Sequence, residues 1–204
     1  MSQCPSPLRL VVQQGHSVVV PENPVSQFFF SSTRSAWFWL IVRLYVGYEW
    51  IHAGWEKLHS PVWTGTHAGV ALRGFLLGAL GKVSTGDVQG WYAKFLSNVV
   101  IPHAHTFSYV VSFGEFLVGL GLILGLLTGP AAFFGTLMNA TYLFAGTLSV
   151  NPILFILATW LVLAWKVAGW YGLDRFALPY LGTPWRRTPA LVKALRPMKT
   201  RQHA

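Results

Sequence analysis

The sequence predicts an all-α integral membrane protein, a four-helix bundle with an outer interfacial segment between the first and second spans. Charged residues make up 10% of the chain and hydrophobic residues 53%, whereas a soluble domain carries about 25% charged residues. Four apolar stretches approach the length of about 20 residues that a membrane-spanning helix needs. A tail rich in arginine and lysine follows the last stretch. One such bundle accounts for most of the 204 residues.

The chain divides into three predicted parts. Residues 1–35 contain four prolines and short, interrupted apolar runs, which favours a mobile cytoplasmic leader over a signal peptide. Residues 36–172 form the membrane domain, and residues 173–204 form a basic cytoplasmic tail. The predicted spans cover residues 36–58, 107–127, 131–148 and 152–171, with residues 59–106 as the outer interfacial segment.

The first span follows serine and threonine residues that can cap a helix. Trp37 and Trp39 stand at its start as predicted interfacial anchors. Within the outer segment, residues 70–80 are apolar but too short to cross a bilayer. From Asp87 onward, apolar residues recur at helical spacing up to Pro102. We expect an in-plane helix capped by Asp87, which either covers the mouth of the bundle or gates a site.

The other spans carry few polar residues. Residues 107–127 contain one charge, Glu115, and a pair of glycines, Gly121 and Gly125, whose spacing allows close helix approach. Residues 128–130 predict a tight turn. Asn139 lies near the middle of the third span, and Pro152 begins the fourth.

The distribution of basic residues predicts the orientation. Because cytoplasmic segments are enriched in lysine and arginine, the tail is predicted to lie in the cytoplasm. Four spans then place both termini there, in a multi-pass protein of the plasma membrane, with residues 59–106 outside. Basic residues beside a final span favour anionic lipid as the partner, and we expect no binding of nucleic acid.

Residues 43–59 are the most polar part of the first span. At about 100° per residue, Tyr45, Glu49, His52, Glu56 and His59 share one face of the predicted helix. A charge at the centre of a bilayer costs about 2.5–3.5 kcal/mol on insertion scales. This face is therefore predicted to look into the bundle or into a wet cavity.

Depth in the membrane links this face to the second span. Glu49 and Glu115 lie at similar predicted distances from the outer surface, on adjacent antiparallel spans. Two close carboxylates tend to share a proton, and an imidazole beside them can relay it. We therefore predict Glu49, His52 and Glu115 as catalytic residues in proton-coupled chemistry on a quinone. The alternative is that these side chains only hydrogen-bond and fix the helix register.

Four further residues are predicted to line the ligand cavity. They are Arg43, Tyr45, Glu56 and Asn139. Arg43 and Lys166 occupy similar depths nearer the cytoplasm, where long cationic side chains also reach out to lipid headgroups.

The sequence contains spacings found in metal sites, but we do not predict a bound metal. Glu49–His52 and Glu56–His59 have the Glu-x-x-His spacing of di-iron bundles, but those sites draw their pairs from different helices. His52, Glu56 and His59 could form a mononuclear site. No haem or flavin is predicted either. Cys4 is the only cysteine, so the chain forms no internal disulfide.

Three segments resemble the DoxX/DoxD family: residues 43–58, 113–139 and 151–185. The resemblance extends over about residues 36–185 and includes Gly114-Glu115, Asn151-Pro152 and Leu173-Asp174-Arg175. DoxD is known as the membrane subunit of thiosulfate:quinone oxidoreductase, which works with a separate subunit, DoxA.

The resemblance implies a four-helix membrane protein with a quinone-linked redox role. The chain is then a membrane subunit that passes electrons from thiosulfate, or a related sulfur compound, to membrane quinone. Its partner is a separate protein subunit or further copies of itself. The alternative is a non-catalytic membrane scaffold that anchors a redox or stress-response partner.

Overall fold

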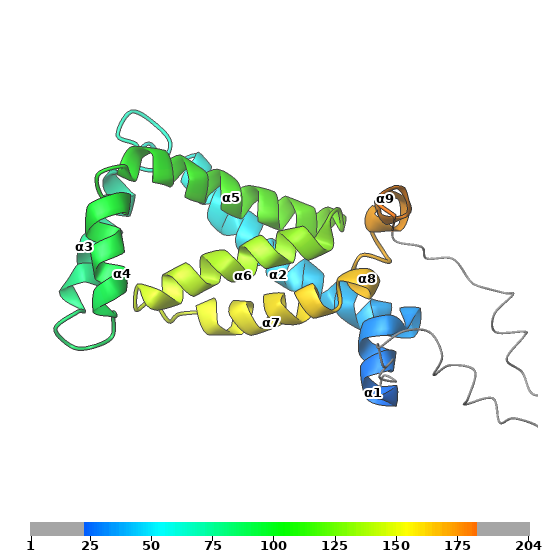
Figure 1. The fold of residues 1–204 in the computed structure, drawn as a ribbon. Coiled ribbons are helices and arrows are strands. Elements are labelled where there is room, and N and C mark those ends of the chain that lie inside the picture. The colour runs from blue at the N-terminus through cyan, green and yellow to red at the C-terminus, as the bar shows by residue number, and fades with distance from the viewer. Residues whose placement is uncertain (1–22, 183–204) are drawn as a thin grey trace, which may run out of the picture.

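A computed structural model describes residues 23–182 of the chain. The first 22 residues of the predicted leader and most of the predicted basic tail therefore lie outside the described residues. Every regular element from residue 23 to residue 182 is helical, so the predicted all-α fold is confirmed. Four helices lie alongside one another as the main bundle (Figure 1): α2 (Ala36–Leu58), α5 (Ala104–Leu124), α6 (Thr128–Phe144) and α7 (Asn151–Leu163).

The four bundle helices differ in how well they suit a membrane span. Helix α5 has 21 residues and is the one described helix that is long and apolar enough to cross a membrane by length and composition. Helix α2 has 23 residues but carries four charged side chains. Helices α6 and α7 have 17 and 13 residues. The predicted fourth span is interrupted, because the chain turns at Ala164 into a second short helix, α8 (Trp165–Ala168).

Helices α2 and α5 form the tightest helix pair in the bundle. A Cβ atom on Gly54 would collide with the backbone of Phe116, and one on Gly119 would collide with the backbone of Ile51. Close approach of this kind needs glycine at the contact. Sequence analysis pointed instead to Gly121 and Gly125. Gly125 ends α5 with a left-handed φ of 62° and packs against the guanidinium of Arg43.

Helices α3 (Val70–Gly81) and α4 (Gly90–Phe95), with the π-helical turn η4 (Leu96–Val100), lie across one end of the bundle (Figure 1). They share a hydrophobic cluster of their own, which includes Leu76, Tyr92 and Leu96. The cap on α4 is Gln89 and not Asp87, whose carboxylate instead accepts a hydrogen bond from the Thr85 hydroxyl. We call residues 70–100 the transverse segment.

Two hydrogen bonds fasten the transverse segment to the end of α6. Lys82 Nζ donates to the carbonyl of Gly146 at 2.7 Å, and the Tyr92 hydroxyl donates to the carbonyl of Thr141 at 2.9 Å. Burial raises the pKa of Tyr92, so this hydroxyl keeps its proton. The transverse segment therefore covers the bundle end as a fixed element of the fold.

The opposite end of the bundle is built from the chain ends of the described region. Residues 24–35, predicted as part of a mobile cytoplasmic leader, form α1 (Pro24–Ser26), the π-helical turn η2 (Gln27–Ser31) and the 3₁₀ turn η3 (Thr33–Ser35). Trp39, predicted as an interfacial anchor, is instead buried in the core, whereas Trp37 is exposed. Helix α9 (Asp174–Tyr180) ends the described chain.

Asp174 joins the start of α9 to the bundle. Its two carboxylate oxygens accept hydrogen bonds from the backbone N–H groups of Leu127 and Thr128 at 2.6 and 2.9 Å. These donors lie at the N-terminus of α6, where the helix dipole favours a negative charge. The predicted tail therefore begins inside the fold, because the buried carboxylate of its second residue, Asp174, is bonded to the start of α6.

The α2–α5 contact predicts a difference between two glycines of the same helix. Gly119→Ala places a methyl group against the Ile51 backbone, which cannot rotate away. We expect a loss of about 1–3 kcal/mol or more, the usual cost of overpacking. Gly114→Ala is the matched control, because its methyl group meets only the flexible end of Met138 at 3.4 Å. Thermal unfolding of both purified variants in detergent measures the effect, and equal melting temperatures would contradict the packing.

Candidate functional site

The candidate site is centred on Glu115, a carboxylate from α5 that is 2% exposed. Lys57 of α2 places its Nζ atom 2.7 Å from Glu115 Oε2. The Tyr142 hydroxyl of α6 donates to Glu115 Oε1 at 2.6 Å. Both carboxylate oxygens are thus bonded, and three helices meet at one group. We call these three residues the Glu115 junction.

The helix contacts explain why these side chains meet. Gly54 lets α2 approach α5 beside Glu115 itself, since its missing Cβ faces the backbone of Glu115 and Phe116. Lys57 follows Gly54 by three residues and therefore lies on a neighbouring part of the same face. Its ammonium also lies over the Trp63 ring, 5.1 Å from the centroid. A cation between a carboxylate and an aromatic face is held in place by both.

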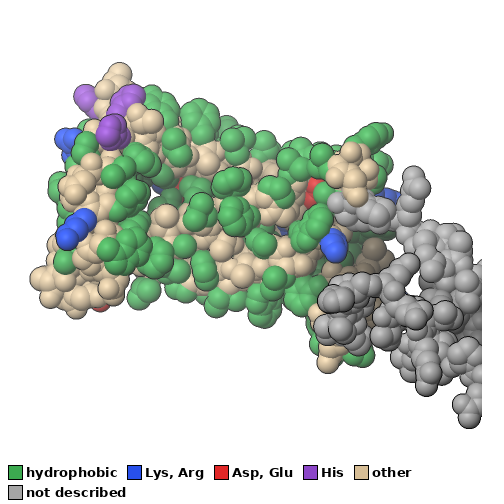
Figure 2. Space-filling model, viewed as in Figure 1, with side chains coloured by type: hydrophobic (Ala, Val, Ile, Leu, Met, Phe, Trp, Pro, Cys, Tyr) green, Lys and Arg blue, Asp and Glu red, His purple; other side chains and the backbone are tan. Residues whose placement is uncertain are grey.

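A cavity of about 310 Å³ opens beside the junction. Figure 2 shows the surface hollowed between the transverse segment and the ends of the bundle helices. Aromatic rings form part of its wall, and two of its polar side chains, Lys57 and Tyr142, contact Glu115. The lining residues are Glu49, Trp50, Ala53, Lys57, Trp63, Leu72, Phe75, Glu115, Tyr142, Thr147, Ser149, Val150, Asn151 and Leu154.

The loop between α6 and α7 forms the rim of this cavity. Ser149 and Val150 are exposed and line it, so the cavity reaches the surface there. Ser149 has a φ of 43°, a left-handed conformation that is uncommon for a residue other than glycine. Backbone conformations of this kind gather at binding sites, where the surrounding structure maintains them.

The structure places the predicted site residues in different surroundings. Glu49 and Glu115 both line the cavity. His52 and Glu56 lie outside the lining and form an exposed pair, 3.8 Å apart, with side chains 57% and 68% exposed. Tyr45 is also exposed and outside the lining. The catalytic roles of Glu49, His52 and Glu115 stay predictions.

The rotation of α2 about its axis explains this separation. Its buried face carries Val46, Trp50 and Gly54, which lie about 60–140° around the helix from Glu49. The predicted polar face is therefore turned away from the bundle, with Glu49 at the edge nearest the cavity. Close packing of the α2 glycines against α5, and of Trp50 against α6, decides the rotation.

Arg43 and Asn139, both predicted to line the cavity, lie outside its lining. Arg43 is buried, and its Nη2 atom donates to the carbonyl of Tyr171 at 3.0 Å. This contact is near Gly125 and Gly172, at the bundle end opposite the transverse segment. Asn139 is buried within α6, and its side-chain atoms make no hydrogen bond among the described residues.

Two members of the Glu115 junction, Lys57 and Tyr142, were not predicted as site residues from the sequence. Lys57 lies only about 80° from Glu49 around α2, so its position alone allowed a cavity-facing role. Tyr142 follows Asn139 by three residues, on the same side of α6. A lysine and a tyrosine near the ends of two helices, with a glutamate midway along a third, were the available signal. The α6–α7 loop carried no comparable pattern.

No group of three or more His, Cys, Asp or Glu side chains that could hold a metal ion occurs among residues 23–182. The cavity instead offers a carboxylate, a phenol and an ammonium in contact, surrounded by aromatic rings. Such a set can bind a polar ring and exchange protons with it.

Comparison with known proteins gives one match. The family model described as DoxX matches residues 38–148. This range contains all but the first two residues of α2, the transverse segment, α5 and α6, and all three residues of the Glu115 junction. No curated protein and no solved structure matches the chain.

Proposed function

Because the chain belongs to the DoxX family, a membrane-associated family, we propose that it is a multi-span membrane protein whose cavity binds the headgroup of a membrane quinone. The observation that carries this proposal is the Glu115 junction on the cavity wall. A buried carboxylate with a phenol on one oxygen and an ammonium on the other is equipped to pass protons.

The proposed membrane arrangement uses four spans. Helices α2, α5 and α6 each cross once, and α7 with α8 supplies the fourth crossing. The basic residues after Leu173 favour a cytoplasmic position for that end. The transverse segment and the cavity then lie at the outer side of the membrane.

Reporter fusions test this arrangement. A reporter fused after Ala204 is expected to be active on the cytoplasmic side, and one inserted within residues 83–86 on the outer side. Residues 83–86 connect α3 to α4 without belonging to either helix. A cytoplasmic signal from this second site would contradict the orientation and place the cavity on the opposite side.

The proton chemistry follows from the quinone reaction. Reduction of a quinone to a quinol takes two electrons and two protons, and oxidation releases them. In the proposal, Glu115 exchanges protons with a quinone oxygen, with Tyr142 as its hydrogen-bonded partner. Glu49, on the same cavity wall, is the second carboxylate that can take up or release a proton. Trp50, Trp63 and Phe75 offer ring faces against which a planar headgroup can pack.

The proposed electron donor is thiosulfate or a related sulfur compound. This part rests on the resemblance to DoxD, in which the donor side involves a separate subunit. The chain described here supplies the quinone site and its proton carriers. The two electrons arrive from a donor held by a partner chain.

A membrane scaffold is the second candidate function. It is favoured by the fact that the Glu115 junction joins α2, α5 and α6 at one point, as a purely structural junction would. A scaffold needs no proton exchange at Glu115, so the two functions differ in their response to substitutions that preserve shape.

Quinone-linked turnover tests the proposed site through Glu115→Gln. Glutamine keeps the shape of the side chain and can still accept the Tyr142 hydrogen bond, but it cannot exchange a proton. We expect turnover to fall by about 10² or more, the range for losing a general acid or base. Glu49→Gln is expected to lower turnover in the same direction. The assay is quinone reduction with the sulfur donor, using membranes that contain the partner chain.

Asp87→Asn is the matched control. Asp87 is an exposed carboxylate that bonds to Thr85 and lies outside the cavity. Its amide variant should retain full turnover. Full activity of both Glu49→Gln and Glu115→Gln would favour the scaffold.

A further inference from the structure

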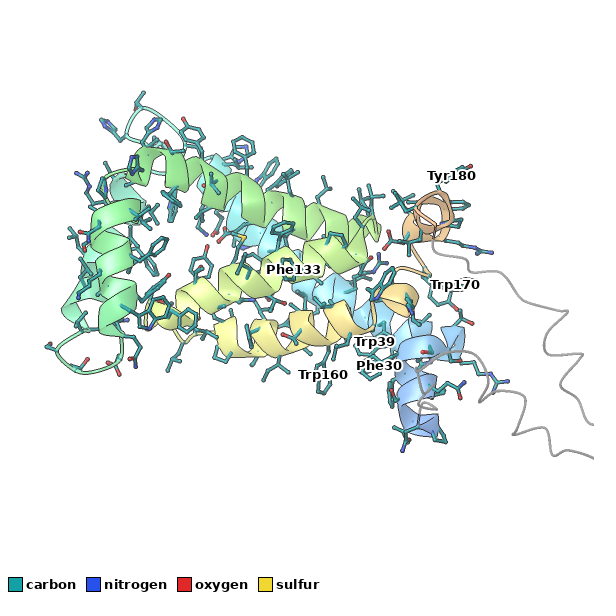
Figure 3. All side chains as sticks on the ribbon, viewed as in Figure 1. Phe30, Trp39, Phe133, Trp160, Trp170 and Tyr180 are labelled. Carbon is teal, nitrogen blue, oxygen red and sulfur yellow. The ribbon has the colours of Figure 1, made fainter. Side chains whose placement is uncertain are left out.

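A second cavity lies at the bundle end opposite the Glu115 junction. This groove has a volume of about 460 Å³. Its walls come from η2, the last residue of η3, the start of α2 and one residue of α7. The lining residues are Phe28, Phe29, Phe30, Ser35, Trp37, Phe38, Trp39 and Trp160. Figure 3 shows Phe30, Trp39 and Trp160 close together at this end.

The exposed surface of the groove is almost entirely apolar, and two polar groups in its wall are bonded to the backbone. Trp39 Nε1 donates to the carbonyl of Phe29 at 2.7 Å. Ser35 Oγ donates to the same carbonyl at 3.0 Å and to the carbonyl of Ser32 at 2.9 Å. The indole N–H groups of Trp37 and Trp160 are the other polar side-chain groups among the lining residues. Because the exposed wall is almost entirely apolar, the part of an occupant that lies in the groove must be apolar.

The aromatic wall is internally packed and partly open to its surroundings. Phe30 and Trp39 rings lie 5.7 Å apart, and Phe29 and Phe38 rings 6.0 Å apart. Trp37 and Trp160 remain 59% and 47% exposed. A groove with a fixed aromatic wall and an open side suits a flexible chain that enters from the surrounding membrane.

Exposed cations lie beside the groove. Arg34 directly precedes the lining residue Ser35. Lys166 is exposed on α8, and α8 packs against η2, which carries Phe28, Phe29 and Phe30. An apolar groove flanked by positive charge matches the two parts of an anionic phospholipid, an acyl chain and a phosphate.

We propose that this groove holds one acyl chain of an anionic phospholipid, whose phosphate contacts Arg34 and Lys166. The site is distinct from the cavity at Glu115 and lies at the other end of the bundle. It requires a membrane but not a quinone. Loss of lipid selectivity and loss of quinone turnover are therefore separate outcomes.

Native mass spectrometry of the full chain tests the headgroup contact. The probes are phosphatidylglycerol and phosphatidylcholine with identical acyl chains, each titrated against the protein in detergent. We expect one phosphatidylglycerol to be retained in preference to phosphatidylcholine. The preference should fall by about fivefold for each cation removed in Arg34→Gln and Lys166→Gln, the effect of one basic residue on anionic lipid.

Arg175→Gln is the charge control, because Arg175 is exposed at the same end but lies on α9 and over the Trp170 ring. Its lipid preference should equal that of the unsubstituted chain. An equal loss in all three variants would overturn the proposal, since general attraction to positive charge would explain it.

Trp160→Ser tests the acyl-chain contact independently of charge. It should reduce retention of both lipids, whereas Phe133→Ser, which removes a similarly exposed ring from α6, should not. Three results would overturn the proposal: no retained lipid, a cross-linked dimer with the groove at its interface, or lipid binding that appears only after residues 1–22 are removed. The last would mean that the chain's own first residues fill the groove.

Discussion

A buried carboxylate in an apolar helix bundle must be paired, and the pairing of Glu115 is the constraint on which this structure depends. Moving a charged group from water into a protein interior costs on the order of several kcal/mol. Lys57 and Tyr142 offset that cost by bonding to both carboxylate oxygens. Because they come from α2 and α6, the same bonds fix both helices against α5. The cavity exists at the place where these three helices are held together.

The rest of the fold holds this junction in place from two sides. Glycine contacts between α2 and α5 set the distance at which Lys57 can reach Glu115. The transverse segment covers one end through Lys82 and Tyr92 and contributes Leu72 and Phe75 to the cavity wall. At the other end, Arg43 and Asp174 connect the start of α9 with α2 and α6. The two ends therefore differ in chemistry: a polar cavity at one and an aromatic groove at the other.

The sequence predicted where the helices lie along the chain better than which face of α2 is buried. Apolar length predicted residues 36–58, which are the bounds of α2. Residues 128–130, predicted as a tight turn, instead open α6, which ends at Phe144 ahead of left-handed Gly146. Helix α7 is shorter than the predicted fourth span, because the chain turns at Ala164. Matched depth predicted Glu49 and Glu115 as a pair. Both line the cavity, but Glu115 lies level with Gly54 of α2 and bonds to Lys57 and Tyr142. His52, Glu56 and Tyr45 were grouped with Glu49 because they share one face of the helix, but glycine packing sets which face of α2 is buried. Such packing depends on the partner helix and cannot be seen in one helix alone.

The most direct test of the account is a double-mutant cycle on Lys57 and Glu115, with unfolding of the purified protein followed in detergent. Lys57→Met alone should destabilise most, because it leaves a buried carboxylate without its cation, a loss of about 3–5 kcal/mol for buried pairs. Adding Glu115→Gln removes that charge and should restore part of the loss, with a coupling energy of about 0.5–3 kcal/mol. Single effects that add within about 0.5 kcal/mol would contradict the account, because the pair would then not hold the three helices together.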